Sequence, residues 1–185
     1  MIYISVFLEL VKNKDKYSQR RLMPSGLIVV TGDDGDAVQF NYSKRRIFDL
    51  CHTYYQNPEV MIIIDPYIAG IERIFEKWAH QELGFVLGVA YACGIKNRVL
   101  YKKTYYKYFG ISQKVERAAY SYCLAHYPKL SFMYKIKDPD TIDKACAAYL
   151  MAKFQELKIE ARERWHRDMN YILEELDDGN EEVLG

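Results

Sequence analysis

The stretch EVMIIID, Glu59–Asp65, is the part of the sequence that decides the fold. Its apolar residues are continuous and do not alternate, which is typical of a strand that is buried on both faces of a sheet. A helical pattern follows over Gly70–Gly94, and its last glycine is a natural helix C-terminus. A short strand is predicted next, over Arg98–Tyr101. This order of elements places the stretch in an α/β domain.

The N-terminal part of the chain predicts three strands in meander order. Apolar residues alternate over Ile2–Val11, which puts Glu9 on the face that also carries Ser5 and Phe7. The next two strands, Gly26–Gly32 and Ala37–Tyr42, are joined by a turn-forming TGDDGD segment. With the later strands, they predict an α/β fold whose mixed five-stranded sheet is flanked by helices.

Three further helices complete the predicted fold. Ser43–Pro58 opens with a serine cap, Ser112–Pro128 has a helical pattern, and the last helix starts near Asp140 and extends past Leu157. The chain then becomes acidic, with the sequence EELDDGNEEVLG at its end. We therefore expect a folded domain over 1–157 and a C-terminal helical extension with an acidic tail over 158–185.

Composition limits the classes of function. The chain has 185 residues, 50% of them hydrophobic, and a net charge of +1, so anion binding must come from local basic patches. Its four cysteines form no CxxC motif, which favours reduced thiols in a cytoplasmic protein. No apolar run is long enough to span a bilayer, so we expect a soluble protein without membrane contact.

Paired acids open the last helix, in DPDTIDKACAAYLMAKF, Asp138–Phe154. Asp138 can cap the helix, and Pro139 suits the first helical position. Asp140 and Asp143 stand three residues apart and share one helix face, where two carboxylates repel each other unless a cation lies between them. The simpler interpretation is a plain helix start with acids in its first turn.

Two more acids end predicted strands. Glu9 lies near the carboxyl end of the first strand, and Asp65 ends the buried one. Strand ends beside a helix start are where open α/β sheets build sites, and oxygen ligands suit Mg²⁺ or Mn²⁺. Two such ions would support in-line displacement at a phosphodiester. Alternatively, Asp65 only begins a turn before Pro66, and Glu9 is an edge-strand acid.

Basic residues form two local groups. Lysines neutralise phosphates and aromatic side chains stack on unpaired bases, so lysines interleaved with tyrosines predict nucleic-acid binding. The alternative is a solvated loop in which lysine stems cover aromatic rings. The predicted DNA-binding residues are Lys44, Arg45, Arg46, Lys102, Lys103, Lys107 and Lys114.

These segments together resemble the RuvC-type Holliday-junction resolvases, a family with a ribonuclease H-like fold. The helix start DTIDKACAAYLMA is similar to the family's D-x-x-D-x-A pattern, and LGFVLGVAYACGI to its L-G-x-x-x-G-V-A helix. IIIDPYIAG resembles its fourth strand, and RVLYKKTYYKYFGISQKVERAA its basic, aromatic segment. The order matches over Val60–Phe154, roughly half of the chain.

The resemblance implies a homodimer that binds branched DNA and cuts four-way junctions with Mg²⁺ or Mn²⁺. It makes Asp65 the central metal ligand, with Asp140 and Asp143 as ligands from the helix. The chain departs from the family in having Asp65 where Glu is usual, and Glu9 in place of an Asp that is closely followed by glycine. Asp15 is a weaker candidate for that first-strand acid. Without such an acid, the protein would bind junctions and not cut them.

One other enzyme class fits part of the chain. QELGFVLGVAYACGIKNRVLY also resembles the E-x-G-x-A-x-A-x-G stretch of nucleoside 2-deoxyribosyltransferase-like proteins, in which Glu82 would be the nucleophile. That hypothesis leaves the Asp140 and Asp143 pair unexplained. In the same helix, Gly84 and Gly88 cost stability relative to alanine, which indicates close packing against the sheet or a second subunit.

Overall fold

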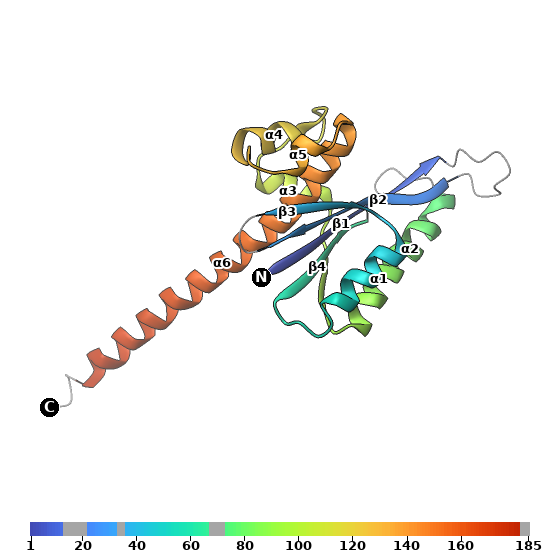
Figure 1. The fold of residues 1–185 in the computed structure, drawn as a ribbon. Helices are drawn as coiled ribbons and strands as arrows, with labels where there is room; N and C mark the ends of the chain where they lie inside the picture. The colour runs from blue at the N-terminus through green and yellow to red at the C-terminus, as the bar shows by residue number, and fades with distance from the viewer. Residues whose placement is uncertain (13–21, 33–35, 67–72, 182–185) are drawn as a thin grey trace. The chain divides into compact units, whose positions relative to one another are not determined.

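The computed structural model describes residues 1–12, 22–32, 36–66 and 73–181. Within these ranges the strands form one mixed sheet in the order β3-β2-β1-β4-β5. Figure 1 labels β1 to β4. The central β1 pairs antiparallel with β2 and parallel with β4. The predicted mixed five-stranded sheet is therefore confirmed. The strands are β1 (Ile2–Lys12), β2 (Leu22–Thr31), β3 (Ala37–Asn41), β4 (Val60–Asp65) and β5 (Lys96–Val99).

The helices agree with the sequence in part. A single helix was predicted over Ser112–Pro128, but α4 spans only part of that range. Helix α3 occupies the basic, aromatic segment for which no helix was predicted, and β5 starts two residues before the predicted Arg98. The helices are α1 (Lys44–Thr53), α2 (Arg73–Ala92), α3 (Lys102–Tyr108), α4 (Ala118–His126), α5 (Phe132–Lys135) and α6 (Pro139–Glu181).

Local end signals were predicted correctly where a short motif decides them. Ser43 caps α1 by accepting a hydrogen bond from the backbone N–H of Arg46 at 3.1 Å. Gly94 follows α2 with φ +67°, a left-handed conformation that glycine adopts at little cost. Asp138 caps α6 by accepting from the backbone N–H of Thr141 at 2.8 Å, and Pro139 is the first helical residue.

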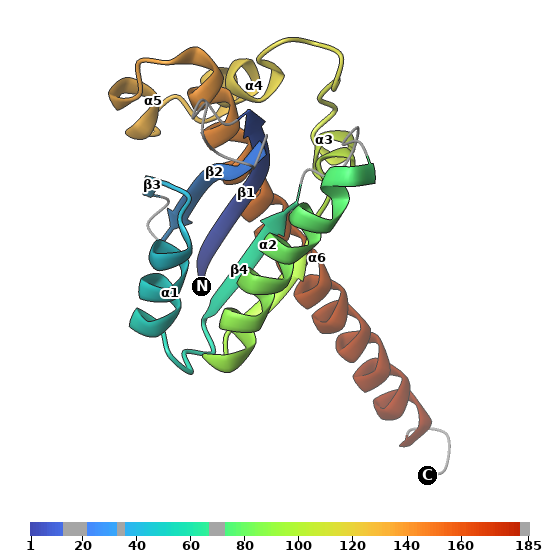
Figure 2. The same ribbon diagram turned by 90° about the vertical axis from the view of Figure 1, so that its right-hand side faces the viewer.

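One face of the sheet packs on α1 and α2. The alternation in β1 places Ile4, Val6 and Leu8 there, in an apolar cluster with Ile47 of α1 and Val86 of α2. Figure 2 shows both helices on the same side of the sheet. Burial of this face stabilises the fold, because each apolar side chain removed from water contributes about 1.5–3 kcal/mol.

The opposite face carries polar residues as well as apolar ones. Ser5 and Phe7 of β1 are buried, and α6 begins on this side with four small residues, Ala145–Ala148, that are each at most 1% exposed. This part of α6 is therefore packed in the core of the first unit, where Cys146 contacts Cys123 of α4. Figure 2 also shows α3, α4 and α5 near the end of the sheet toward which β1 and β4 run. The carboxyl ends of β1 and β4 are therefore the place to look for a site.

The chain divides into two compact units, Met1–Ala152 and Lys153–Gly185, with α6 contributing to both. The domain limits expected from the sequence, 1–157 and 158–185, remain a prediction. All four cysteines are buried and free, as predicted for reduced thiols. Among the described helices, none is both long enough and apolar enough to cross a membrane.

Candidate active site

A cavity of about 280 Å³ lies in the first unit, where β1 meets α3, the segment before α4, and α6. Four carboxylates and three cationic side chains share its wall, so acids and bases are nearly balanced there. Of the predicted acids, Glu9, Asp140 and Asp143 line the same cavity. Its lining residues are Phe7, Glu9, Lys102, Glu116, Arg117, Asp140, Asp143 and Lys144.

Asp65 lies beside this cavity on the same face of the sheet. In the parallel pairing of β1 with β4, Asp65 is opposite Phe7, and Glu9 stands two residues further along β1. The predicted register is confirmed, since Glu9 shares a face with Ser5 and Phe7. The side chain next to Asp65 on β1 is nevertheless the aromatic ring of Phe7, which lines the cavity.

Tyr105 of α3 covers Asp65. Asp65 is only 1% exposed, and the Tyr105 hydroxyl donates a hydrogen bond to its Oδ2 at 3.0 Å. Burial raises the pKa of Tyr105 well above its ordinary value, and the nearby Asp65 charge raises it further. The tyrosine therefore stays protonated and acts as a donor to a buried carboxylate. This contact explains how an acid is accommodated at the end of an otherwise apolar strand.

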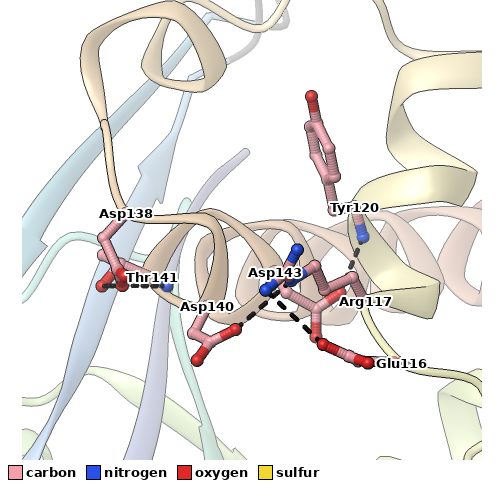
Figure 3. Close-up of polar contacts among 7 residues, drawn as sticks. All are labelled: Glu116, Arg117, Tyr120, Asp138, Asp140, Thr141 and Asp143. Atoms are coloured by element: carbon pink, nitrogen blue, oxygen red, sulfur yellow. Dashed lines mark hydrogen bonds and ion pairs between the residues drawn. The ribbon is translucent and has the colours of Figure 1, made fainter.

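The acids at the start of α6 have separate partners, as Figure 3 shows. Asp140 Oδ1 lies 3.4 Å from Nε of Arg117. Asp143 Oδ1 accepts a hydrogen bond from the backbone N–H of Tyr120 at 2.8 Å. The cap residue Asp138 bonds Thr141, and these hydrogen bonds lower the pKa of Asp138. The helix-start interpretation is thus correct for Asp138, whereas Asp140 contacts Arg117 before α4 and Asp143 contacts the first turn of α4.

Glu9 is held by a lysine that the sequence analysis did not single out. Lys144 Nζ lies 2.9 Å from Glu9 Oε1, which joins α6 to β1. Lys144 follows Asp143 directly in the chain and also lines the cavity. The position next to the paired acids was visible in the sequence, but its partner was not, because the two residues are 135 positions apart.

Arg117 is the second cation that the sequence analysis missed. It precedes α4 with φ +52° and ψ +36°, in the left-handed region that residues with a Cβ seldom adopt. Its guanidinium contacts Asp140 and, at 3.5 Å, Glu116 Oε1. A strained backbone conformation at a charged cavity wall is a pattern often found at functional sites.

Tyr106 adds an unpaired hydroxyl next to the acids. It is 1% exposed, and its hydroxyl has no hydrogen-bond partner among the residues that the structure describes. Burial raises the pKa of Tyr106, and the charge of Asp143 is the next cause. The ammonium of Lys102 lies 4.7 Å from the centre of its ring, a cation–π distance. Buried hydroxyls without a partner are rare, but Tyr106 is not among the residues that line the cavity.

The predicted metal ligands come together only in part. Glu9, Asp140 and Asp143 line one cavity, and Asp65 lies beside it. However, within the described ranges no three acidic, histidine or cysteine side chains are placed to hold one ion. Whether the four acids bind metal therefore stays a prediction. Asp15, the weaker alternative for the first strand, lies outside the described residues.

The predicted DNA-binding residues separate into two places. Lys102, Lys103 and Lys107 lie on α3, where Lys102 reaches the cavity, and Lys114 is exposed in the segment between α3 and α4. The others are on α1, across the sheet, and each has an intramolecular contact. Lys44 pairs with Glu82 at 3.0 Å, Arg45 Nε lies 3.9 Å from Asp49 Oδ2, and Arg46 lies over the Phe40 ring.

Glu82 has a structural explanation that does not need a nucleophile. It is 6% exposed, and it accepts a hydrogen bond from the Tyr42 hydroxyl at 2.8 Å as well as pairing with Lys44. Burial raises the pKa of Tyr42, so the donor stays protonated. Glu82 is not among the residues that line the described cavity. These contacts tie α2 to α1 and to the chain after β3.

Comparison with known proteins identifies the fold. No protein-family model matches the chain, and no curated protein does. Solved structures do match, and among them are two of RuvC from Thermus thermophilus, one in complex with a Holliday-junction substrate. Each matches with a TM-score of 0.56 and 11% identity over 85% of this chain. The matches cover 96% of the junction-bound RuvC chain and 97% of the other.

The chain has the ribonuclease H-like fold of RuvC. At 11% identity the likeness concerns the fold, and function must be argued from the site. The fold does explain why acids from β1, β4 and α6 lie near one another although they are far apart in the sequence.

Proposed function

We propose that the protein is a structure-selective endodeoxyribonuclease that binds four-way DNA junctions and cuts them with Mg²⁺ or Mn²⁺. One observation carries the proposal. Carboxylates from β1 and α6 share a cavity with Lys102 and Arg117, beside Asp65, on a fold shared with a RuvC structure that holds a Holliday-junction substrate. Carboxylates bind the metal ions and cationic side chains bind the DNA phosphates. Metal-dependent cleavage of a phosphodiester needs both kinds of group.

The donor set fits a divalent metal in its chemistry. Glu9, Asp65, Asp140 and Asp143 offer only oxygen ligands, which Mg²⁺ and Mn²⁺ prefer. The present contacts of the acids must change, because Glu9 is paired with Lys144 and Asp140 with Arg117. When bound, the metal would polarise the phosphate and activate a water molecule.

The side chains of the protein would place the DNA. Lys102 at the cavity wall and Lys103, Lys107 and Lys114 around it would neutralise backbone phosphates. Exposed Tyr101 and Tyr108, at the two ends of the same short helix, offer rings on which unpaired bases at a junction centre could stack. Arg117 would stabilise negative charge as it builds up on the phosphate.

A second copy of the chain would allow both strands of a junction to be cut. The sequence left two explanations for the glycines of α2, packing on the sheet or on another subunit. A Cβ on Gly84 or Gly88 would meet nothing within 4 Å, so neither glycine is needed for packing on the sheet. This open space is compatible with the second explanation, and we propose a homodimer that uses this helix.

The proposal is tested by incubating the protein with a synthetic four-way junction and a duplex of the same sequence, with Mg²⁺, Mn²⁺ or chelator. We expect metal-dependent cuts in the junction and far fewer in the duplex. Binding of the junction without cleavage under every metal condition would refute the nuclease proposal.

A second candidate function is junction binding without cleavage, on a resolvase fold that has lost its chemistry. The observation in its favour is that the ring of Phe7 lies opposite Asp65 on β1 and that each of the four acids has a protein partner. The same assay separates the two candidates, since both predict junction binding and only the first predicts cuts.

A further inference from the structure

The side chain of Lys144 lines the charged cavity. Its ammonium lies 2.9 Å from Glu9 Oε1, and the two side chains are 33% and 17% exposed. Water screens such a pair only partly, so it is stronger than an ion pair on an open surface. Glu9 is the first-strand acid of the proposed metal site, so a lysine already holds one of the carboxylates that the ion needs.

The charge of Lys144 also reaches the acids of its own helix. Lys144 stands one turn after Asp140, a spacing at which an acid followed by a lysine attract each other. Hydrogen bonds from Thr141 lower the pKa of Asp138, and the charges of Lys144 and Arg117 add to that effect. The ammonium therefore offsets part of the repulsion among the acids at the start of α6.

Arg117 is less well placed for this role. Its contact with Asp140 is longer, at 3.4 Å, and the two side chains are 43% and 69% exposed. It also contacts Glu116, so its charge is shared between two acids. Lysine is, in addition, a compact charge on a flexible stem, which can leave a carboxylate without moving the backbone.

We propose that Lys144 is an internal counter-ion of the cavity, which holds Glu9 in the metal-free chain and competes with the divalent cation for that carboxylate. The inference rests on the proposed function, because it needs a metal site that includes Glu9. Its consequence is that the free protein binds metal more weakly than its acids alone would allow. Removing the lysine charge should therefore strengthen metal binding, which the loss of a purely structural contact would not do.

The test is a calorimetric titration of Mn²⁺ into the metal-free protein without DNA. Lys144→Met removes the charge and keeps the apolar stem, and Lys144→Gln removes the charge but leaves a group that can donate to Glu9. We expect both variants to bind Mn²⁺ about twofold to fivefold more tightly than the unchanged protein, the range that loss of a competing ion pair allows.

The matched control is Lys135→Met. Lys135 is an exposed lysine on α5 that is not part of the cavity wall. This control variant reports how much the loss of one positive charge elsewhere changes the affinity for Mn²⁺, and we expect less than a twofold effect. A second measurement, thermal unfolding in chelator, should show a lower midpoint for Lys144→Met than for Lys135→Met, and Mn²⁺ should remove most of that difference.

The outcomes are distinct. Tighter Mn²⁺ binding in both Lys144 variants and not in the control supports the inference. The role of Lys144 would be overturned if the unchanged protein, both Lys144 variants and Lys135→Met bind Mn²⁺ equally tightly while Glu9→Gln binds it more weakly. That outcome would leave the nuclease proposal standing. If no protein binds Mn²⁺, including the Lys144 variants, then both the inference and the metal-dependent function are wrong. Should Lys144→Met fail to fold, Lys144→Gln decides alone.

Discussion

The two faces of β1 are made from one strand but hold different chemistry. On the side of α1 and α2, Ile4, Val6 and Leu8 are at most 4% exposed and pack in an apolar cluster. On the side of α6, Phe7 and Glu9 line a cavity that contains four carboxylates and three cations. The difference follows from the two-residue period of a strand, which sends neighbouring side chains to opposite faces.

This contrast separates stability from chemistry. Burial of apolar side chains stabilises the fold, whereas a buried carboxylate costs free energy unless a partner offsets it. On the α6 side the acids do have partners: Tyr105 for Asp65, Lys144 for Glu9 and a backbone N–H for Asp143. Substitutions on the first face should thus change stability, and substitutions on the second should change binding and cleavage.

The largest expected effect is on cleavage, in Asp143→Asn. Asn keeps an oxygen that can accept the hydrogen bond from the backbone N–H of Tyr120, so thermal unfolding should change little. The substitution removes a charged ligand of the proposed metal site. Loss of a residue that only supports a metal ligand typically lowers activity by about 10–100-fold, so junction cleavage should fall by more than that. Asp49→Asn makes the same chemical change on α1 and should cleave normally. If Asp143→Asn cuts the junction as fast as the unchanged protein, Asp143 is not part of the proposed site.

On the apolar face the expected effect is on stability, in Ile62→Ala. Ile62 of β4 is fully buried in the cluster with α1 and α2, so truncation should lower the free energy of unfolding by about 2–5 kcal/mol. Val38→Ala on β3, where the side chain is 50% exposed, should stay within about 0.5 kcal/mol. Urea denaturation measures both. A loss of cleavage in correctly folded Ile62→Ala would contradict the separation of the two faces.

The sequence predicts well what short patterns control. Alternation over Ile2–Val11 placed Glu9 on its correct face, and the cap at Ser43 and the end at Gly94 came from single residues. The start of α6 followed from Asp138 and Pro139 for the same reason. Each of these depends on interactions within a few residues, which an amino-acid pattern contains.

The partners of the acids were beyond such patterns. Lys144 and Glu9 meet because α6 packs on β1, across 135 positions of sequence, and Tyr105 and Asp65 are 40 apart. The segment before α4 was predicted as helix, although Arg117 adopts a left-handed conformation that no local signal indicates. Tertiary packing decides these contacts, so the acids could be listed from the sequence but their ion pairs could not.

A smaller effect should distinguish the two groups of basic residues. The triple change of Lys102, Lys103 and Lys107 to Ala removes charge at the cavity end of the sheet. The slope of log affinity against log salt concentration for junction binding should become shallower by about 0.9 per lost phosphate contact. The matched triple change of Lys44, Arg45 and Arg46 removes the same charge from α1. Because those residues already contact Glu82, Asp49 and Phe40, we expect the smaller change in slope there.

Fluorescence anisotropy over a range of salt concentrations measures both slopes. Equal changes for the two triple variants would mean that the DNA reaches across to α1 as well. No change in the α3 variant would place the proposed DNA path away from the cavity.

The smallest expected effect is on the outer surface of α2, and it tests whether that surface is free. Gly84 is exposed, and an added Cβ there would meet nothing within 4 Å. Alanine favours a helix interior over glycine by about 1 kcal/mol, so Gly84→Ala should raise the melting temperature of the dilute protein by about 2–4 °C. Gly94→Ala is the contrasting control. There φ is +67° and a Cβ would lie 3.2 Å from Gln56 Cγ, so the same substitution should destabilise the protein.

Sedimentation at increasing protein concentration gives the second half of this test. If a second copy packs against α2 in the proposed dimer, the added methyl group must fit between the two helices, and Gly84→Ala should weaken association while it stabilises the monomer. A stabilised monomer with unchanged association would place the dimer contact elsewhere. A lower melting temperature in dilute protein would contradict the open space at Gly84, and with it the argument that these glycines serve a partner and not the sheet.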